Sequence, residues 1–378
     1  MSKKKIVFLT GTRADFGKIK SLIKITQASP DYEVYIFATG MHMNSLYGAT
    51  VDEIYKSGFE NIYPYINHDT IESMDRTLAK TIDGFSLYIS EINPDLIVVH
   101  GDRVEAMAGA IVGSFNNILV AHIEGGEISG TIDESIRHAV SKLAHIHLVA
   151  NEQAKIRLIQ LGEYAESVFV LGSPDLDLMN PEHLPSLESV KHYYDIVFDE
   201  FAIAMFHPVT TEYHYILEQV KSFVDALLES NLNYIVIYPN NDLGSIEILH
   251  EYKRLENNKR FRIFPSLRFE YFLRLLKEAS FIIGNSSAGV REAPFYNTPT
   301  VDIGSRQNSR VSLPSVLHTR DTKEEILNTI KRVKSYPIYA LEDKHHFGTG
   351  ESDLMFLALL DSKDIWNISC QKQFQELS

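Results

Sequence analysis

The sequence is poor in cysteine and has no long apolar run. Its 378 residues include a single cysteine, Cys370, so no internal disulfide can form, which favours a reducing compartment. No stretch approaches the roughly 18 apolar residues of a membrane-spanning helix. The apolar run after the lysines at 3–5 is also shorter than a secretory signal requires. We therefore expect a cytoplasmic protein with no membrane partner.

Basic residues are outnumbered as well. The chain has 36 Lys and Arg against 50 Asp and Glu, a formal net charge of −14. Proteins that bind nucleic acid usually present a basic face, so no nucleic-acid partner is expected. With 44% hydrophobic residues, 20 Gly and 13 Pro, the composition is that of a globular protein. The length indicates two domains, each large enough to bury its own core.

Short apolar runs rich in Val and Ile recur along the chain, with longer amphipathic stretches between them. Because the runs are continuous rather than alternating, they are typical of strands buried on both faces of a parallel sheet. In the first half, strands are expected at 5–10, 34–38, 96–100, 118–122, 146–150 and 168–171. The expected helices between them cover 16–29, 71–92, 104–116, 133–144 and 152–161.

The same alternation starts again after residues 179–191, where two prolines interrupt the periodicity. Alternating strands and helices predict two doubly wound, Rossmann-like α/β domains, at 1–180 and 190–355, facing a ligand cleft. In the second half, strands are expected at 201–206, 234–238, 261–264, 281–284 and 300–303, and helices at 213–230 and 270–279.

Polar side chains directly follow most of these strands. An open parallel α/β sheet binds its ligands at the carboxyl edge of the strands, so ionisable groups at that edge are placed for chemistry. The residues at these positions are Arg13, Asp15, His100, Asp102, Arg103, His122, Glu124, His207, Asn240, Ser286 and Ser287.

Two of the strand ends are suited to an anion. Arg13 lies where a strand passes into a helix, so its guanidinium and the helix amides can face an anion, although a surface Arg beside an Asp15 cap has the same pattern. The small residues at 285–291 open another helix and would suit a diphosphate, with Glu292 accepting from ribose hydroxyls. A plain serine N-cap is the alternative. Neither segment has the motif of an ATP or NAD site.

Asp102, Glu124 and Asp133 come from three consecutive strand–helix connections. Carboxylates gathered in a closed cleft shift one another's pKa, which can supply an ionised base and a protonated acid near neutral pH. Alternatively, Asp102 and Asp133 only cap helices and Glu124 is exposed.

Histidines lie beside these carboxylates. His100 and His122 could join them in a metal site, but the chain lacks the tight His-x-x-x-His spacing of such sites, and strand-end histidines are often structural. His207, from the second half, is placed to reach across the predicted cleft.

Together these segments strongly resemble the hydrolysing UDP-N-acetylglucosamine 2-epimerases, which include bacterial sialic-acid capsule enzymes and the epimerase half of an animal bifunctional enzyme. The Ser-Gly-Thr-Ile-Asp-Glu segment at 129–134 is similar to the hydrolysing rather than the non-hydrolysing members. The segments that carry the resemblance are 11–17, 39–42, 100–103, 122–127, 129–138, 206–211 and 284–292.

The resemblance implies a glycosyltransferase-B-like fold whose C-terminal helix, here 356–378, packs back on the first domain. It implies release of UDP from UDP-N-acetylglucosamine with inversion at C2, through a 2-acetamidoglucal that is then hydrated to N-acetylmannosamine for sialic acid synthesis. No cofactor and no metal are implied. Because the family is homo-oligomeric, the resemblance implies a homodimer or homotetramer.

The resemblance also implies roles for particular residues. Asp102, Glu124 and Asp133 match the catalytic carboxylates, and His207 is expected to reach the phosphates or the leaving oxygen. The family commonly has two Asp where this chain has Asp133 and Glu134, and which carboxylate takes the proton stays open. The matched positions for UDP are Arg13, Ser286, Ser287 and Glu292, and those for further substrate contacts are Arg103, Asn240 and Arg306.

Four other functions fit parts of the pattern. A hydrolysing 2-epimerase of UDP-2,4-diacetamido-trideoxyhexose, on the route to legionaminic acid, would share the UDP and C2 residues. A glycosyltransferase of the same fold would not need three carboxylates at successive strand ends. A metal-dependent hydrolase and a non-catalytic nucleotide-sugar binding protein are the remaining alternatives.

Overall fold

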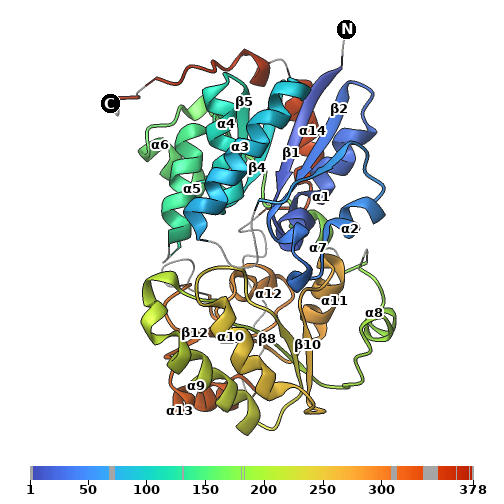
Figure 1. Ribbon diagram of the computed structural model, residues 1–378, viewed down its shortest axis with the longest axis vertical. Helices are drawn as coiled ribbons and strands as arrows, with labels where there is room; N and C mark the ends of the chain where they lie inside the picture. The colour runs from blue at the N-terminus through green and yellow to red at the C-terminus, as the bar shows by residue number, and fades with distance from the viewer. Residues whose placement is uncertain are drawn as a thin grey trace. The chain divides into compact units, whose positions relative to one another are not determined.

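The chain folds into two compact units (Figure 1). The first unit consists of Met1–Glu127, Asp133–His183 and His345–Ser378, and the second of Ile128–Ile132 and Leu184–Lys344. Residues 348–355, predicted with the second domain, therefore fall in the first unit. The computed structural model describes residues 3–67, 73–129, 132–179, 181–182, 184–307, 313–334, 348–362, 364–373 and 375–376.

The first unit contains a seven-stranded parallel sheet with the order β3-β2-β1-β4-β5-β6-β7. The strands are β1 (Lys4–Thr10), β2 (Tyr32–Ala38), β3 (Ile62–Pro64), β4 (Leu96–His100), β5 (Leu119–Ile123), β6 (Ile146–Val149) and β7 (Val168–Val170). The helices are α1 (Arg13–Ala28), α2 (Val51–Lys56), α3 (Met74–Ile92), α4 (Val104–Phe115), α5 (Ile132–Leu143), α6 (Glu152–Gln160), α7 (Leu176–Met179) and α14 (Ser352–Asp361).

The second unit contains a six-stranded parallel sheet with the order β10-β9-β8-β11-β12-β13. Its strands are β8 (Ala202–Met205), β9 (Tyr234–Ile237), β10 (Phe261–Phe264), β11 (Ile282–Gly284), β12 (Thr300–Ile303) and β13 (Val316–Thr319). Its helices are α8 (Leu187–Tyr194), α9 (Ile216–Glu229), α10 (Ser245–Tyr252), α11 (Phe269–Glu278), α12 (Glu292–Phe295) and α13 (Lys323–Lys334). The prediction of two doubly wound α/β domains is confirmed.

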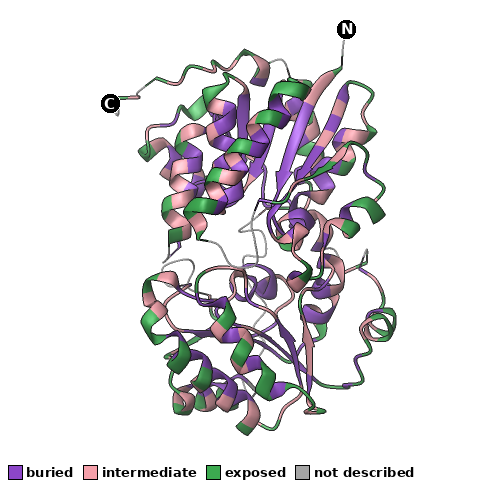
Figure 2. Ribbon diagram, viewed as in Figure 1, coloured by how far each residue is buried: buried purple, intermediate pink, exposed green. Residues whose placement is uncertain are grey.

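The continuous apolar runs follow from burial on both faces of each sheet. In β1, Ile6 and Phe8 belong to one buried cluster, whereas Val7 and Leu9 belong to another. Successive side chains of a strand point to opposite faces, so both sets must be apolar. Figure 2 shows the central strands of the first unit drawn as buried.

The order in which strands are added reverses at one position in each sheet. In the first unit the order turns between β1 and β4, and in the second between β8 and β11. The connections that leave such a pair of strands go to opposite faces, which opens a crevice at their carboxyl ends. The two crevices are therefore the places in the fold where a ligand is expected to bind.

The C-terminal helix is shorter than the predicted 356–378. The structure has α14 at Ser352–Asp361, and its first amides, those of Ser352 and Asp353, donate to the Asp177 carboxylate at 2.8 and 3.0 Å. Phe356 packs edge-on against Phe8, with ring centroids 6.2 Å apart. Among the described residues, no helix is both long and apolar enough to cross a membrane.

Candidate active site

The turn after β1 is closed by Asp15. Its Oδ2 accepts from the Gly11 amide at 3.0 Å and from the Thr10 hydroxyl at 2.8 Å. The alternative in which Asp15 caps the helix is wrong: Thr12 is the N-cap of α1, and its hydroxyl accepts from the Asp15 amide at 3.0 Å. Asp15 therefore faces the crevice between β1 and β4.

His100, the last residue of β4, lies between two carboxylates. Its Nδ1 is 2.8 Å from Asp15 Oδ1, and its Nε2 is 3.4 Å from Glu124 Oε1. Burial opposes the charged ring, but the two carboxylates outweigh burial and raise the pKa of His100 to about 10. Burial opposes ionisation of Asp15 as well, but His100 together with the hydrogen bonds from Gly11 and Thr10 outweighs burial and lowers the pKa of that carboxyl.

Glu124 follows β5 in a left-handed backbone conformation, with φ of 63°. This conformation is uncommon for a residue other than glycine, and such strain is concentrated at functional sites. Its Oε1 accepts from the Ser173 hydroxyl at 3.2 Å and lies 4.0 Å from Lys18 Nζ. The alternative that Glu124 is exposed is wrong, because only 6% of the residue is accessible.

Asp102, in the loop after β4, forms an ion pair with Arg137 of α5. The Arg137 side chain is 3% exposed, and its Nη1 donates to the Glu127 carbonyl at 3.4 Å. The negative charges that act on this guanidinium include those of Asp102, Glu124 and Asp133. One buried cation is thus common to all three predicted catalytic carboxylates.

Arg137 was not predicted as a site residue, although it lies within the 129–138 segment. Asp133 and Arg137 are four residues apart on α5 and therefore lie on one face of the helix. That spacing is the sequence feature from which a site role for Arg137 could have been predicted. The partner Asp102 is 35 residues away in sequence, so the ion pair itself could not be predicted from the local sequence pattern.

His122 ties the loop after β4 to α5. Its Nε2 contacts the Gly101 carbonyl at 2.8 Å and its Nδ1 contacts the Ser141 hydroxyl at 2.9 Å. A carbonyl only accepts, so Nε2 carries the proton, and burial lowers the pKa of His122 to about 3. No group of three or more His, Cys, Asp or Glu able to hold a metal is found in the described part of the chain.

The two predicted arginines of the first unit each lie near a carboxylate. Arg13 Nη2 is 3.6 Å from Glu53 Oε1, and Arg103 Nε is 3.3 Å from Glu105 Oε2. Glu105 is 1% exposed and lies directly against Gly11, where an added Cβ would come within 2.8 Å of the carboxyl carbon. Glycine directly after β1 therefore leaves the space that the Glu105 carboxyl occupies.

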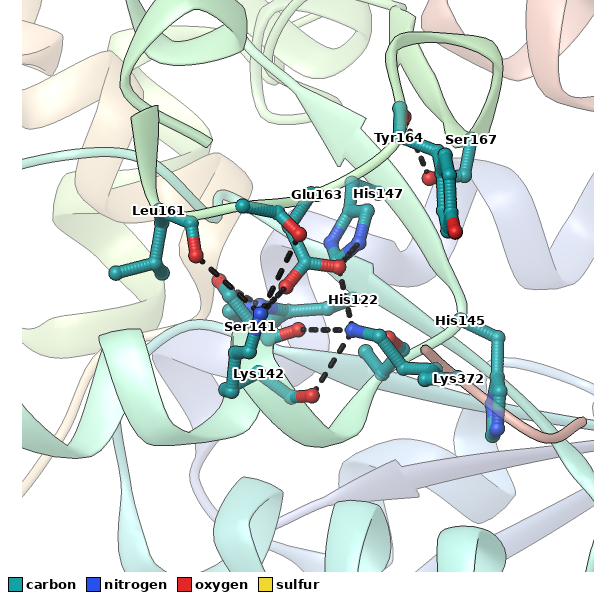
Figure 3. A network of polar contacts seen from close by, with 12 residues as sticks. His122, Ser141, Lys142, His145, His147, Leu161, Glu163, Tyr164, Ser167 and Lys372 are labelled. Carbon is teal, nitrogen blue, oxygen red and sulfur yellow. Dashed lines mark hydrogen bonds and ion pairs between the residues drawn. The ribbon is translucent and has the colours of Figure 1, made fainter. Parts of the chain in front are cut away.

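A second polar network anchors α5 from its C-terminal end (Figure 3). The buried Glu163 carboxylate accepts from Lys142 Nζ at 3.1 Å, contacts His147 Nε2 at 2.9 Å, and is paired with Lys372. Lys372 also donates to the carbonyls of Lys142 and Ala144 at 2.9 and 2.6 Å. A lysine at these carbonyls satisfies groups that the helix leaves unpaired.

In the second unit, His207 follows β8 and is held by two asparagines. The His207 amide donates to Asn285 Oδ1 at 2.6 Å, and Asn285 Nδ2 donates to the His207 carbonyl at 2.8 Å. The Asn240 amide donates to His207 Nδ1 at 3.0 Å. The neutral ring therefore carries its proton on Nε2.

The loop after β11 forms a compact turn beside His207. Gly284 has φ of 136°, and a Cβ there would lie 1.8 Å from the Met205 carbonyl oxygen, so only glycine fits. Ser286 caps the 3₁₀ turn Ser287–Gly289, with its hydroxyl accepting from the Ala288 amide at 3.3 Å. The predicted helix after this loop is a four-residue α12, which begins at the buried Glu292.

Arg306, in the loop after β12, joins the same edge of the second sheet. Its Nη1 donates to the Asn285 carbonyl at 3.3 Å, and Gln307 Nε2 donates to the same oxygen at 2.8 Å. The predicted site residues are thus gathered at one edge within each unit. These are Arg13, Asp102, Arg103, Glu124 and Asp133 in the first unit, and His207, Asn240, Ser286, Ser287, Glu292 and Arg306 in the second.

Known proteins resemble the chain over nearly its whole length. A family model described as UDP-N-acetylglucosamine 2-epimerase matches residues 24–361. A Neisseria meningitidis serogroup B protein named UDP-N-acetylglucosamine 2-epimerase is 46% identical over 376 residues, covering 99% of this chain and 100% of the relative. A Legionella pneumophila UDP-N,N'-diacetylbacillosamine 2-epimerase (hydrolyzing) is 36% identical, covering 88% of this chain and 90% of the relative.

Solved structures share the fold. The Methanocaldococcus jannaschii UDP-GlcNAc 2-epimerase in complex with UDP-GlcNAc and UDP has a TM-score of 0.80 at 20% identity, covering 94% of this chain and 99% of the other. A UDP-GlcNAc 2-epimerase from Neisseria meningitidis bound to UDP-GlcNAc has a TM-score of 0.77 at 16% identity, with 94% and 99% covered. With the family model and the 46% identical relative, the chain belongs to the UDP-N-acetylglucosamine 2-epimerase family.

Proposed function

We propose that this protein is a hydrolysing 2-epimerase that converts UDP-N-acetylglucosamine and water to UDP and N-acetylmannosamine, for sialic acid synthesis. The observation that carries the proposal is the grouping of Asp102, Glu124 and Asp133 around one buried cation, Arg137. An Escherichia coli relative, 32% identical over 333 residues and named polysialic acid biosynthesis protein P7, supports the pathway.

The proposed chemistry has two redox-neutral steps and needs no cofactor. A carboxylate removes the C2 proton while the C1–O bond to UDP breaks, which leaves 2-acetamidoglucal and UDP. Water then adds across the double bond, with hydroxyl to C1 and a proton to the opposite face of C2. The C2 proton is weakly acidic, so a positioned base and stabilisation of the leaving diphosphate are both required.

We assign the candidate residues to proton transfer or to substrate binding according to their chemistry. The carboxylates of the first unit handle protons, and which of them takes the C2 proton stays open. Ser286, Ser287 and Glu292 are assigned to the diphosphate and ribose, and His207 offers its Nε2 proton to the phosphates or the leaving oxygen. The residues assigned to further contacts with UDP and the sugar are Arg13, Arg103, Asn240 and Arg306. A homodimer or homotetramer remains part of this proposal.

A second candidate is the 2-epimerase reaction on UDP-2,4-diacetamido-trideoxyhexose, on the route to legionaminic acid. The Legionella relative and a 31% identical Campylobacter jejuni relative, GDP/UDP-N,N'-diacetylbacillosamine 2-epimerase (hydrolyzing), favour it. The same carboxylates would serve both substrates, since both reactions occur at C1 and C2.

The test is a proton NMR time course with purified protein, UDP-N-acetylglucosamine, D2O and EDTA. Free UDP with N-acetylmannosamine deuterated at C2 supports the proposal. UDP-N-acetylmannosamine without UDP release contradicts hydrolysis, and turnover of only the diacetamido substrate moves the assignment to the second candidate. Turnover in a parallel sample without EDTA but not in the sample with EDTA would instead indicate a metal-dependent hydrolase.

Variants separate catalysis from simple binding. Asp102→Asn and Glu124→Gln should abolish turnover and leave the Kd for UDP within about tenfold, because binding of UDP is assigned to other residues. Unchanged turnover in both variants would contradict a catalytic role for these carboxylates.

A further inference from the structure

Three ionisable side chains from separate elements meet at the crevice between β1 and β4. Asp15 comes from α1, His100 ends β4, and Glu124 follows β5. Their side chains are 13%, 8% and 8% exposed, respectively. None of these contacts is local in sequence, so the sheet order brings the three groups together.

We propose that Asp15 and His100 are positioning residues for Glu124: a doubly protonated His100, anchored by Asp15, holds Glu124 ionised and in one orientation for proton transfer. This inference rests on the proposed function and adds two residues to its machinery.

The arrangement of acceptors around the ring favours the cation. Asp15 Oδ1 lies 2.8 Å from Nδ1 and Glu124 Oε1 lies 3.4 Å from Nε2, so each ring nitrogen has a carboxylate oxygen within ion-pair distance. A neutral imidazole has one N–H and would turn a lone pair toward one of the two carboxylates. Only the imidazolium offers a donor to both, and the pKa of His100, raised to about 10, agrees with this geometry.

The anchor on the Asp15 side is built from the backbone and a hydroxyl. Thr10 and Gly11 donate to Asp15 Oδ2, which leaves Oδ1 directed at His100. On the other side, Ser173 donates to the Glu124 oxygen that faces the ring. Rotation of either carboxylate would therefore break a hydrogen bond as well as the contact with His100.

Other charged and titratable groups also act on this cluster. Lys18 Nζ lies 4.0 Å from Glu124 Oε1 and 3.6 Å from Asp175 Oδ2, so its charge is divided between two carboxylates. The ring of His122 is neutral, with both nitrogens bonded to Ser141 and Gly101. From further elements, His42 interacts with Asp15 and Arg137 interacts with Glu124. His100 is thus the cation in direct contact with both Asp15 and Glu124.

Without the imidazolium, a buried Glu124 would favour its neutral form, since burial raises the pKa of a carboxyl and a neighbouring cation lowers it. A base that must be ionised would then act only at higher pH. Replacement of His100 should therefore move the acid limb of the pH profile upward, whereas loss of mere packing would lower activity equally at every pH.

The first experiment does not depend on turnover. Full-length protein labelled with ¹⁵N in its histidines is titrated by NMR from pH 6 to 11, and the His100 signals are assigned by their loss in His100→Gln. Two protonated ring nitrogens at pH 8 support the proposal, and Asp15→Asn should lower the midpoint by at least about one pH unit. A neutral ring at pH 8, with the proton on Glu124, overturns it.

The second experiment measures kcat and KM from pH 5 to 9 for wild type, His100→Gln, Asp15→Asn and a control, His192→Gln, on an exposed face of α8. We expect the first two variants to shift the acid limb of kcat/KM upward by about one unit or more, with KM within about threefold. The control should match wild type. An unshifted limb in folded Asp15→Asn protein contradicts the proposal even where His100→Gln fails to fold.

The two hypotheses fail separately. Wild-type protein that releases no UDP from UDP-N-acetylglucosamine contradicts the proposed function, while the NMR titration still decides the protonation state of His100. Conversely, normal turnover with a neutral His100 contradicts only the positioning role.

Discussion

The buried guanidinium of Arg137 forms an ion pair with the partly exposed carboxylate of Asp102, which joins the loop after β4 to the second turn of α5. The pair positions one predicted catalytic carboxylate relative to the helix that carries another, Asp133. It therefore links two parts of the candidate active site that are distant in sequence.

We expect Arg137→Lys to lower kcat at least about tenfold with little change in the Kd for UDP. A lysine keeps the charge but loses the planar fork that reaches both Asp102 and the Glu127 carbonyl. Steady-state kinetics and calorimetric titration with UDP measure the two effects. Arg254→Lys is the control, because Arg254 forms an exposed ion pair with Asp225; an equal loss of kcat there would contradict the interpretation.

Asp133→Asn should inactivate the enzyme, whereas Glu134→Gln should retain most of the activity. Asp133 is four residues before Arg137 and therefore shares a helix face with it. Glu134 lies on a more exposed face, where its Oε1 is 3.6 Å from His138 Nε2. The two neutral isosteres differ by one position on the same helix, so each serves as the control for the other. The reverse order of activities, measured by UDP release, would assign the catalytic role to Glu134.

Arg13→Ala should weaken UDP binding by about tenfold or more, because a guanidinium at a strand–helix junction contributes charge-assisted hydrogen bonds to an anion. Its Nη2 lies 3.6 Å from Glu53 Oε1. Lys24→Ala, at an exposed position on the same helix, should leave the Kd unchanged. An unaltered Kd in Arg13→Ala, measured by calorimetry, would refute the role of Arg13.

Lys372→Met should destabilise the first unit by about 2–3 kcal/mol, because it leaves the buried Glu163 short of one cation and leaves carbonyls of α5 unpaired. The only tryptophan of the chain, Trp366, packs against the core of this unit, so its fluorescence reports urea unfolding there. Lys56→Met removes an ion pair between the exposed Lys56 and Glu53, 3.8 Å apart, and should change the midpoint little. Equal midpoints for the two variants would contradict a stabilising role for Lys372.

Acid should destabilise the first unit between about pH 6.5 and pH 4. Burial lowers the pKa of His122 to about 3 and of His42 to about 4, and it also lowers the pKa values of His145 and His147. The unfolded chain binds these protons below about pH 6.5 and the folded state does not, so stability falls as pH falls. Asp177, whose pKa burial raises to about 6, acts in the opposite direction.

At about 1.4 kcal/mol per pKa unit, the loss should amount to several kcal/mol by pH 4. Urea midpoints from Trp366 fluorescence at pH 7.5, 6.5, 5.5 and 4.5 measure it, and His42→Asn should give a shallower slope. His100 contributes on the alkaline side: its stabilising charge is present below pH 6.5 and is lost as pH rises through about 10. A midpoint that is constant between pH 6.5 and 4.5 would contradict the assignment of buried neutral histidines.

The central strands were predictable, as were the edge strands β7 and β10, whereas the other two edge strands were missed. The predicted 96–100 and 300–303 coincide with β4 and β12, because a strand buried on both faces needs a continuous apolar run. The sequence analysis missed β3 (Ile62–Pro64) and β13 (Val316–Thr319), which lie at sheet edges and have partly exposed side chains. Three or four half-exposed residues carry too weak a periodicity to be told from a loop.

The local pattern of apolar runs was sufficient to place polar residues such as Asp102 and His207 at the carboxyl edges of parallel strands, since strand direction and alternation follow from short-range sequence. Which residues touch depended on the tertiary fold. Glu124 contacts His100 because β5 lies beside β4. His100 contacts Asp15 because β4 pairs with β1, although β2 and β3 lie between these two strands in the sequence. Strand order is decided by packing between distant segments, and a local pattern carries no information about it.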